Sequence, residues 1–297
     1  MNILITGASG LLGRSVFKQL DANPAFNVTG TAYSRAGDRL IKLDLNDGTQ
    51  LQQTLEQLRP DIVIHSAAER WPDRCAEQPD AAWALNVDSS AQLAQQCSAA
   101  GAQLVYISTD YVFDGTAPPY SADDTPNPVN FYGRSKLAGE RAVLANGDHW
   151  VLRLPWLFGP VERLSESGVT ALLDTVRDPA PATLDDWAIR FPTSVEEVAA
   201  VLEQCLLKIT SGIRLGGIYQ WSGDTPCTRF QLAHLVADAC GLKADHLRGD
   251  SAPQFSEPRP QNCQLDKSRL TGQGIQGGEP LQRQLARCLQ PFLGKGE

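Results

Sequence analysis

The chain contains no apolar run long enough to cross a bilayer, no run of basic residues and no closely spaced pair of cysteines. A membrane span needs about 18 or more apolar residues in a row, so no membrane contact is expected. Nucleic-acid binding needs clustered cations, and a net charge of −8 argues against it. A strand-like run begins directly after Met1, which leaves no room for a targeting peptide and predicts a cytoplasmic protein.

The cysteines and histidines lack the spacings of a disulfide framework or a metal site. Seven cysteines, an odd number, are widely spread over 297 residues, which is typical of reduced intracellular thiols. The four histidines show no metal-ligand spacing either. We therefore expect structural roles for these side chains and no bound metal.

Short β-rich runs alternate with helical stretches through the first half of the chain. The expected strands are Asn2–Thr6, 26–33, 40–43, 61–65, 103–108 and Trp150–Leu154. The expected helices are 11–20, 49–58, 81–100 and Phe131–Ala145. This alternation predicts an α/β fold with a Rossmann-type, doubly wound parallel sheet that is covered on both faces.

The second half has irregular connections punctuated by proline, which predicts a smaller C-terminal lobe. Helices are expected at 195–209, 230–240 and Leu281–Leu293, and a strand at 218–221. We expect residues 1–160 and about 193–222 to form the sheet domain, and 161–192 and 223–297 to form the lobe. The loop at 115–130 holds four prolines, Tyr120 and acidic residues, and would suit a lid.

A glycine-rich turn joins the first expected strand to the first expected helix. Gly7, Gly10 and Gly13 follow the spacing G-x-x-G-x-x-G. Such a turn lets the backbone approach a pyrophosphate, and the helix N-terminus offers free N–H groups to it. The strand–turn–helix context therefore predicts a dinucleotide site.

The end of the second expected strand indicates which dinucleotide binds. Tyr33, Ser34 and Arg35 stand where an acid usually holds the ribose of NAD, and the first acid, Asp38, comes later. A cation and a hydroxyl suit a 2′-phosphate, so NADP(H) is the expected cofactor, with a solvated Arg35 as the alternative. Asp44 is a candidate to hydrogen-bond the adenine.

Tyr132 and Lys136 form a Y-x-x-x-K pair on one face of an expected helix. An ammonium about 4 Å away would lower the pKa of a tyrosine by up to roughly two to three units from about 10. Thr109, at the end of the fifth expected strand, can hydrogen-bond a carbonyl oxygen. Together they predict carbonyl reduction, in which the cofactor gives the hydride and Tyr132 gives the proton. Thr109 orients the carbonyl oxygen. Lys136 lowers the pKa of Tyr132 and holds the nicotinamide ribose. An ordinary helix surface pair and a loop cap are the alternatives.

Several motifs resemble those of the extended short-chain dehydrogenase/reductase family: TGASGLLG, SAAE, LNV, STDYVFDG, YGRSK and LRLPWLFG. Within it, STDYVFDG, FPTSVEEVA and RPQNCQLD resemble the dTDP-4-dehydrorhamnose reductases. That resemblance implies an NADPH-dependent reductase of a nucleotide-linked 4-keto-6-deoxysugar. Residues 67–88, 113–120, 161–170 and 221–223 resemble the regulatory β subunit of methionine adenosyltransferase, which shares the fold and binds NADP.

The resemblance implies Thr109, Tyr132 and Lys136 as the catalytic set. Around the cofactor it implies Gly7, Ser9, Gly10, Leu11, Leu12, Gly13, Arg35, Asp44, Leu45, Ala67, Ala68, Asn86, Ser108, Tyr132, Lys136 and Pro155. Around the substrate it implies Glu69, Asp110, Trp156, Arg190 and Arg259. Either arginine could meet a nucleotide phosphate or serve a structural ion pair. Dehydration is not expected, because Asp110 is followed by Tyr111 and not by a second acid.

The two resemblances leave two functions open. The reductase has the intact catalytic set in its favour, and the regulatory subunit has the closer match over 67–88 and 161–170. The regulatory subunit continues into a basic, aromatic tail for partner contact beyond the equivalent of Glu297, so the partner role is the weaker expectation. A nucleotide-sugar substrate is thus the expected partner, the methionine adenosyltransferase catalytic subunit is the alternative, and a homodimer is left open. A cofactor-loaded sensor without chemistry ranks last, because both Tyr132 and Lys136 are present.

Overall fold

The computed structural model describes residues 1–35, 37 and 39–294, so Asp38 lies outside the described residues. Its main sheet has seven parallel strands in the order β10-β6-β5-β4-β1-β2-β3. These are β1 (Asn2–Thr6), β2 (Asn27–Ala32), β3 (Leu40–Lys42), β4 (Ile62–His65), β5 (Gln103–Thr109), β6 (Trp150–Leu154) and β10 (Gly217–Gln220). The chain runs outward from β1 to β3 and then returns to β4 on the other side of β1, which creates a crevice at the carboxyl ends. The predicted Rossmann-type sheet is confirmed.

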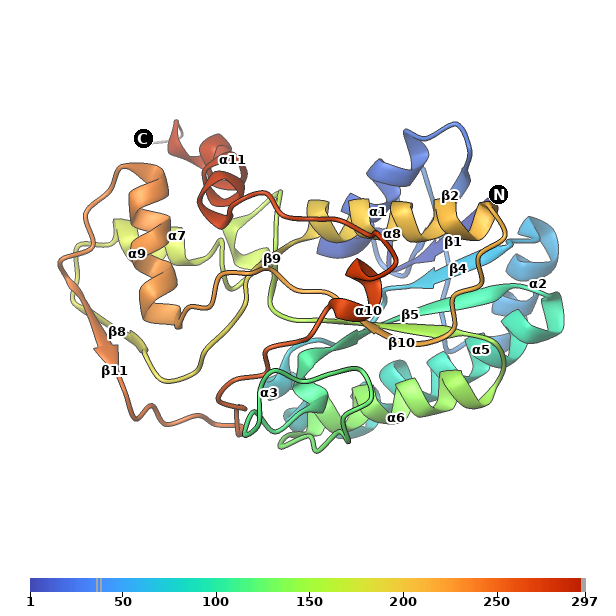
Figure 1. Ribbon diagram of the computed structural model, residues 1–297, viewed down its shortest axis with the longest axis horizontal. Coiled ribbons are helices and arrows are strands. Elements are labelled where there is room, and N and C mark those ends of the chain that lie inside the picture. The colour runs from blue at the N-terminus through green and yellow to red at the C-terminus, as the bar shows by residue number, and fades with distance from the viewer. Residues whose placement is uncertain (36, 38, 295–297) are drawn as a thin grey trace.

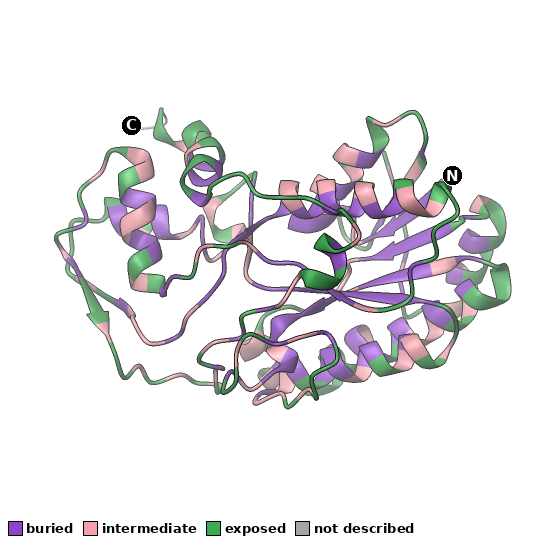
Figure 2. Cartoon of the chain, in the orientation of Figure 1, coloured by how far each residue is buried: buried purple, intermediate pink, exposed green. Residues whose placement is uncertain are grey.

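Helices cover both faces of the sheet (Figure 1). One face carries α1 (Leu11–Asp21) and α8 (Val195–Thr210), and the other carries α2 (Gly48–Leu58), α5 (Ser89–Ala100) and α6 (Phe131–Ala145). Ile3 and Ile5 belong to the core under α1 and α8, whereas Leu4 belongs to the opposite core. Successive residues of β1 thus bury on opposite faces, and the central strands are buried along most of their length (Figure 2).

The helix that carries Tyr132 begins at a buried asparagine. Asn130 Oδ1 accepts a hydrogen bond from the Gly133 N–H at 2.8 Å, which satisfies one free donor at the start of α6. Its Nδ2 donates to the Pro258 carbonyl at 2.9 Å. One side chain therefore fixes both the start of α6 and the chain segment that passes beside it.

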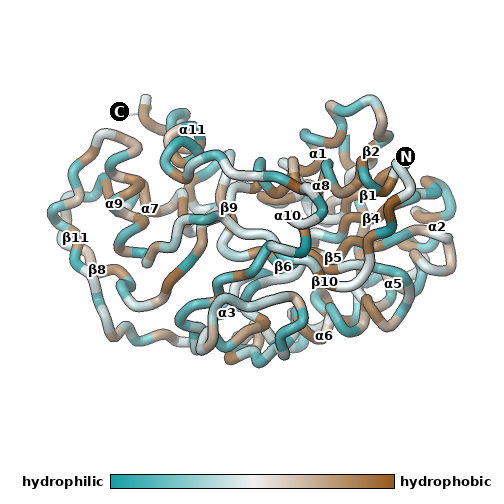
Figure 3. The backbone as a smooth tube through the Cα atoms, in the orientation of Figure 1, coloured by the Kyte–Doolittle hydropathy of each residue, from teal (hydrophilic) through white to brown (hydrophobic). Residues whose placement is uncertain are grey.

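The C-terminal lobe has a hydrophobic core of its own. Its helices are α7 (Leu172–Arg177), α9 (Arg229–Cys240) and α11 (Leu281–Leu293), and its strands are β8 (Ala182–Asp185) and β11 (Leu247–Asp250). Figure 3 shows hydrophobic segments in this lobe as well as in the main sheet. Strands β7 (Leu157–Phe158) and β9 (Thr193–Ser194) pair where the chain passes between the two parts.

The helix predicted over 81–100 is interrupted in the structure. It divides into α4 (Pro79–Trp83), a π-helical segment (Ala84–Asp88) and α5, preceded by the short helix α3 (Pro72–Glu77). The π-helical segment carries Asn86, whose side chain turns into the protein and is fully buried. None of the described helices has the length and hydropathy that a membrane span requires.

Candidate active site

A cavity of about 880 Å³ opens at the carboxyl ends of the central strands. The strands end together there, because Thr6 pairs with His65 in the β1–β4 ladder and Thr109 with Leu154 in the β5–β6 ladder. The C-terminal lobe supplies another part of the wall, including Arg229. Both the volume and the position, at the point where the strand order reverses, are typical of a ligand site in such a sheet.

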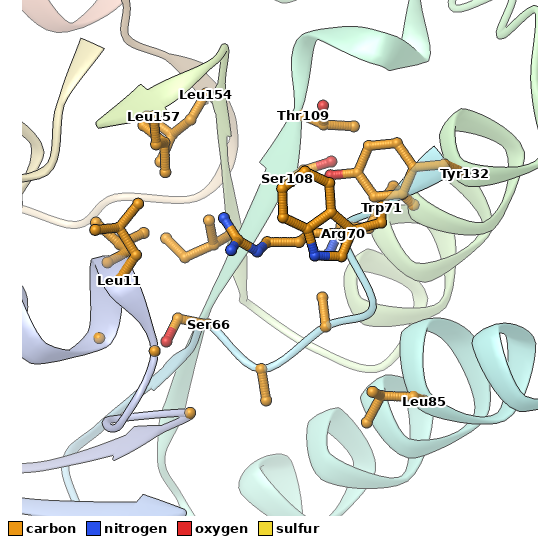
Figure 4. A pocket seen from close by; sticks show the side chains of 18 of the residues that line it. Leu11, Ser66, Arg70, Trp71, Leu85, Ser108, Thr109, Tyr132, Leu154 and Leu157 are labelled. Atoms are coloured by element: carbon orange, nitrogen blue, oxygen red, sulfur yellow. The ribbon is translucent and has the colours of Figure 1, made fainter. Parts of the chain in front are cut away.

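Most of the predicted site residues line this cavity. From the predicted cofactor set these are Gly7, Ser9, Gly10, Leu11, Leu12, Gly13, Arg35, Asp44, Leu45, Ala67, Ala68, Ser108, Tyr132, Lys136 and Pro155. From the predicted catalytic and substrate sets they include Thr109, Asp110, Trp156, Arg190 and Arg259. Residues far apart in sequence are thus brought to one space (Figure 4).

Among the described residues, Glu69 and Asn86 do not line the cavity, so their contacts with a ligand remain predictions. The Asn86 side chain accepts from the Glu69 N–H at 2.9 Å and donates to the Glu69 carbonyl at 3.0 Å. It also donates to Ser135 Oγ on α6 at 3.1 Å. The amide is therefore committed to holding the loop after β4 against α6.

The glycine turn closes tightly against the end of β4. Gly7 has a φ of +70°, and a Cβ there would lie 2.8 Å from the Ala67 nitrogen. A Cβ on Gly13 would lie 2.2 Å from the Gly7 carbonyl oxygen, so the first turn of α1 can approach the strand only with glycine. The free N–H groups at the start of α1 consequently face the cavity, beside the lining residues Leu11 and Leu12.

Tyr132 lines this cavity together with Ser108 and Thr109 (Figure 4). Burial raises the pKa of Tyr132 above its usual range, and the Thr109 side chain acts in the opposite direction. We expected Lys136 to lower this pKa, but burial is the larger effect. The phenol therefore keeps its proton at neutral pH, which is the form that donates a proton.

Lys136 lies one helical turn beyond Tyr132 and is only 3% exposed. Its Nζ lies 4.0 Å from the centroid of the Tyr106 ring. Burial lowers the pKa of Lys136 to about 7, although the nearby Glu140 favours the charged form. The charge of this lysine therefore changes near neutral pH.

An acid and an arginine lie next to Thr109, which is predicted to orient the carbonyl. Thr109 Oγ1 donates to Asp110 Oδ1 at 3.1 Å, and burial raises the pKa of Asp110 to about 7 while Arg190 opposes the rise. The Arg190 guanidinium lies 5.5 Å from the Tyr111 ring centroid and donates to the Pro260 carbonyl at 3.0 Å. Arg190 thus has structural contacts on one side and borders the cavity on the other.

The other predicted substrate residues are also held by neighbours. Arg259 Nη2 donates to both carboxylate oxygens of Asp73 at 2.9 Å, which ties the lobe to α3. The Trp156 ring packs closely on Gly168. A Cβ on Gly168 would lie 2.8 Å from a carbon atom of the ring. Both side chains reach the cavity from fixed positions.

The loop at 115–130, which was expected to suit a lid, packs against Phe113 and the chain near Gln264 and Asp266. Tyr120 is buried and stacks on Phe113 with the ring centroids 4.2 Å apart. Its N–H donates to the Gln264 carbonyl at 2.8 Å, and its own carbonyl accepts from the Asp266 N–H at 2.8 Å. No described residue of 115–130 belongs to the cavity wall.

Sequence reasoning missed two bulky side chains that enter the cavity from the loop after β4, Arg70 and Trp71 (Figure 4). The Arg70 guanidinium lies 4.6 Å from the Trp71 ring centroid and donates to the Glu166 carbonyl at 2.6 Å. The Glu166 carboxylate in turn accepts from Arg14 of α1 at 2.5 Å. We call Arg14, Glu166 and Arg70 the cleft bridge. Its only sequence signal was that Arg70 and Glu166 fall within the two segments that resemble the regulatory subunits.

His65 has a structural role. Its Nδ1 lies 2.7 Å from Thr6 Oγ1 and its Nε2 lies 3.0 Å from Ser90 Oγ. Burial lowers the pKa of His65 to about 3, so the ring is neutral. All seven cysteines are free thiols. Within 1–35, 37 and 39–294, no group of three or more His, Cys, Asp and Glu side chains is arranged to hold a metal ion.

Comparison with known proteins identifies the family. The family model described as the RmlD substrate binding domain matches residues 1–293. Methionine adenosyltransferase 2 subunit beta from Xenopus tropicalis is 45% identical over 293 residues, which cover 98% of this chain and 87% of the relative. dTDP-4-dehydrorhamnose reductase from Streptomyces griseus is 31% identical over 294 residues, covering 97% and 92%. The solved dTDP-4-dehydrorhamnose reductase from Bacillus anthracis in complex with NADP has a TM-score of 0.83 at 26% identity and covers 98% of each chain. The chain therefore belongs to the RmlD substrate binding domain family, within the extended short-chain dehydrogenases/reductases.

Proposed function

We propose that this protein is an NADP(H)-dependent oxidoreductase that reduces the carbonyl of a nucleotide-linked 4-keto-6-deoxysugar. The observation that carries the proposal is the placement of Thr109, Tyr132 and Lys136 in the same cavity as the glycine turn. The structural likeness to the NADP complex of dTDP-4-dehydrorhamnose reductase supports it.

The residues of the cavity fit a dinucleotide. The close approach of Gly7 to Ala67 and of Gly13 to Gly7 leaves the start of α1 open to a pyrophosphate. Arg35 borders the same cavity at the end of β2, where its charge suits the 2′-phosphate of NADP. NADPH bound there would supply the hydride.

The residues on the opposite wall supply and direct the proton. The protonated Tyr132 donates its proton to the carbonyl oxygen as that oxygen gains charge. Thr109 donates a hydrogen bond to the same oxygen and so fixes its position. Lys136, when charged, stabilises the phenolate that Tyr132 becomes, and in the reductase it would also hold the nicotinamide ribose.

The lobe side of the cavity suits an anionic nucleotide. Arg190, Arg229 and Arg259 reach this wall, and guanidinium groups bind phosphate in a bidentate manner. Trp156 offers a flat apolar surface beside them. We therefore propose residues 161–192 and 223–297 as the substrate-binding lobe, and 1–160 with about 193–222 as the cofactor-binding domain.

Sequence identity favours a second function. Methionine adenosyltransferase 2 subunit beta proteins are 45% identical in Xenopus tropicalis and 44% in Bos taurus, above the 31% of the reductase from Streptomyces griseus. On this alternative the protein would bind NADP and associate with a methionine adenosyltransferase catalytic subunit, with little or no turnover. A cytoplasmic location and a homodimer remain predictions under either function.

One experiment separates the two functions. Purified protein is mixed with NADPH and a dTDP-4-keto-6-deoxysugar, the loss of NADPH absorbance is followed, and the Tyr132→Phe variant is the control. The protein is also added to a methionine adenosyltransferase, whose rate is measured. Oxidation of NADPH that is lost in Tyr132→Phe supports the reductase. No oxidation, together with a changed transferase rate, overturns it in favour of the regulatory subunit.

A further inference from the structure

A buried ion pair lies directly behind the catalytic residues. Glu140 follows Lys136 by one turn of α6 and is 1% exposed. Its Oε2 accepts from Arg153 Nη2 at 2.7 Å, and its Oε1 accepts from Arg153 Nε at 2.9 Å. Oε1 also accepts from the hydroxyl of Ser108 at 2.5 Å. Two-point pairing of this kind fixes the carboxylate in both position and orientation.

The pair joins the three elements that make the catalytic wall. Ser108 precedes Thr109 at the end of β5, Arg153 lies opposite Ser108 in the β5–β6 ladder, and Glu140 belongs to the helix of Lys136. A shift of α6 relative to β5 would therefore break hydrogen bonds to Glu140. The carboxylate consequently sets the distance between the threonine on the strand and the tyrosine and lysine on the helix.

Glu140 also favours the charged form of Lys136, although its carboxylate is already paired with the Arg153 guanidinium. The titratable groups around this lysine come from four elements: His65 from β4, Cys75 from α3, Tyr106 from β5, and Tyr132 and Glu140 from α6. His65 has a pKa of about 3 and Cys75 one of about 12, and burial raises the pKa values of both tyrosines. Near neutral pH these four are uncharged. Among the described groups that face Lys136, the negative charge is therefore that of Glu140.

We propose that Glu140 is a positioning residue for the reaction: fixed by Arg153, it holds the end of β5 through Ser108 and keeps the buried Lys136 ammonium charged next to Tyr132. The inference rests on the proposed reductase function. Glu140 itself touches neither substrate nor cofactor, because it lies behind the described wall of the cavity.

The test is the pH profile of the Glu140→Gln variant. The glutamine is nearly isosteric but uncharged, so Lys136 should lose its proton at a lower pH. The pH at which kcat falls should move down by about one to two units, the usual effect of one neighbouring charge. Glu140→Asp retains the charge and should keep the wild-type pH of that fall, while kcat decreases because the shorter side chain no longer reaches Ser108.

Glu197→Gln is the matched control. Glu197 is a partly buried carboxylate on α8 that does not border the cavity described above. It accepts hydrogen bonds from Trp221 Nε1 at 2.9 Å and from Gln284 Nε2 of α11 at 2.9 Å. Its substitution also removes an internal carboxylate that accepts two hydrogen bonds, but it should leave the pH profile unchanged. An unshifted profile in Glu140→Gln, or an equal shift in Glu197→Gln, would overturn the inference. Should Glu140→Gln fail to fold, a shifted profile in Glu140→Asp would overturn it.

The affinity for NADPH, measured by fluorescence across the same pH range, gives a second readout. Lys136 borders the cavity, so loss of its charge should weaken NADPH binding at a lower pH in Glu140→Gln than in wild type. If wild type binds NADPH but oxidises none with the sugar nucleotide, the proposed function fails. The affinity profile then tests the part of the inference that needs no turnover, that Glu140 keeps Lys136 charged: a shift supports it, and identical profiles refute it.

Discussion

Tyr132 and Lys136 show what a two-residue pattern can and cannot predict. Their spacing places both side chains on one face of α6, and the structure brings both to the cavity. The spacing does not reveal that Lys136 is buried and Tyr132 half-buried, and the loss of solvent moves each toward its neutral form. The protonated phenol suits carbonyl reduction, but the cause is desolvation and not the lysine. Arg259 is a similar case, because its partner Asp73 is 186 residues away in the sequence.

Burial of Lys136 should make stability depend on pH. Its pKa is about 7 in the folded protein and 10.5 ordinarily, so between these values the unfolded chain binds the extra proton. The free energy of unfolding therefore rises with pH in this window, by up to about 1.4 kcal/mol per unit from this group. The Lys136→Met variant has no lysine to bury in its less favourable form, so it should be more stable than wild type near pH 7. The difference in the free energy of unfolding between the two proteins should shrink as the pH rises.

Urea unfolding of both proteins at several values between pH 7 and pH 9 checks this prediction. The buried cysteines lower the free energy of unfolding as the pH rises in the alkaline range, because burial raises their pKa values. Both proteins contain these cysteines, so their effect is the same in both curves. The difference between the two curves therefore isolates Lys136. A difference that stays constant with pH would refute the prediction.

Gly13→Ala should disrupt the glycine turn. The added methyl would meet the Gly7 carbonyl oxygen at 2.2 Å, a contact that only a backbone shift can relieve. We expect a loss of stability of about 1–3 kcal/mol and a large loss of NADPH affinity. Gly294→Ala is the control, because a Cβ there meets nothing within 4 Å. Thermal unfolding and NADPH titration are the measurements, and unchanged affinity in Gly13→Ala would contradict the role of the turn.

At the scale of elements, apolar patterning predicted the long helices and the central strands well. The ranges Phe131–Ala145, Trp150–Leu154 and Leu281–Leu293 match the structure. The π-helical segment was not predicted, because its residues share the helical apolar spacing of the flanking turns. The short elements β7, β8, β9 and β11 were also missed, since two to four residues carry too little periodicity.

The cleft bridge should control how fast a ligand enters the cavity. Arg70 crosses from the loop after β4 to the Glu166 carbonyl, and its side chain stands in the cavity near Tyr132 (Figure 4). Arg70→Ala should therefore speed both the association and the dissociation of NADPH several-fold. Because Arg70 is exposed, loss of its hydrogen bond to Glu166 and of its contact with Trp71 should lower the free energy of unfolding by only about 1 kcal/mol.

Stopped-flow fluorescence measures both rates. Arg74→Ala is a suitable control, because Arg74 is exposed on α3 and is not among the described residues of the cavity wall. Equal rates in the Arg70→Ala variant and wild type would show that the bridge does not limit access.

At the scale of the whole molecule, cofactor binding and proton transfer are predicted to use different walls of one cavity. The glycine turn contributes the wall expected to hold the dinucleotide, and α6 with the end of β5 contributes the wall expected to handle the proton. The sequence predicted both walls, because each depends on a local motif. It did not predict the side chains that close the space between them, because these contacts join segments distant in the chain.

Tyr132→Phe should separate the two walls. NADPH at a hundred times its Kd stabilises the folded state by about 2.7 kcal/mol, and the variant should keep most of this gain because the phenol oxygen is one contact among many. Turnover should fall by about 100-fold or more, the usual contribution of a general acid. Thermal unfolding with and without NADPH, together with the assay, tests this. Loss of the thermal shift along with turnover would mean that the residue serves binding.

The path of the chain between the two parts restricts how such proteins can be recombined. After β6 the chain enters the lobe, returns to the sheet domain with α8 and β10, and leaves again for α9. It then revisits the sheet at α10 (Ser268–Thr271), beside β10, before it ends in the lobe with α11 (Figure 1). Transplanting the lobe from a relative would thus require several splice points, and a graft with a single junction would pair half of one lobe with half of another.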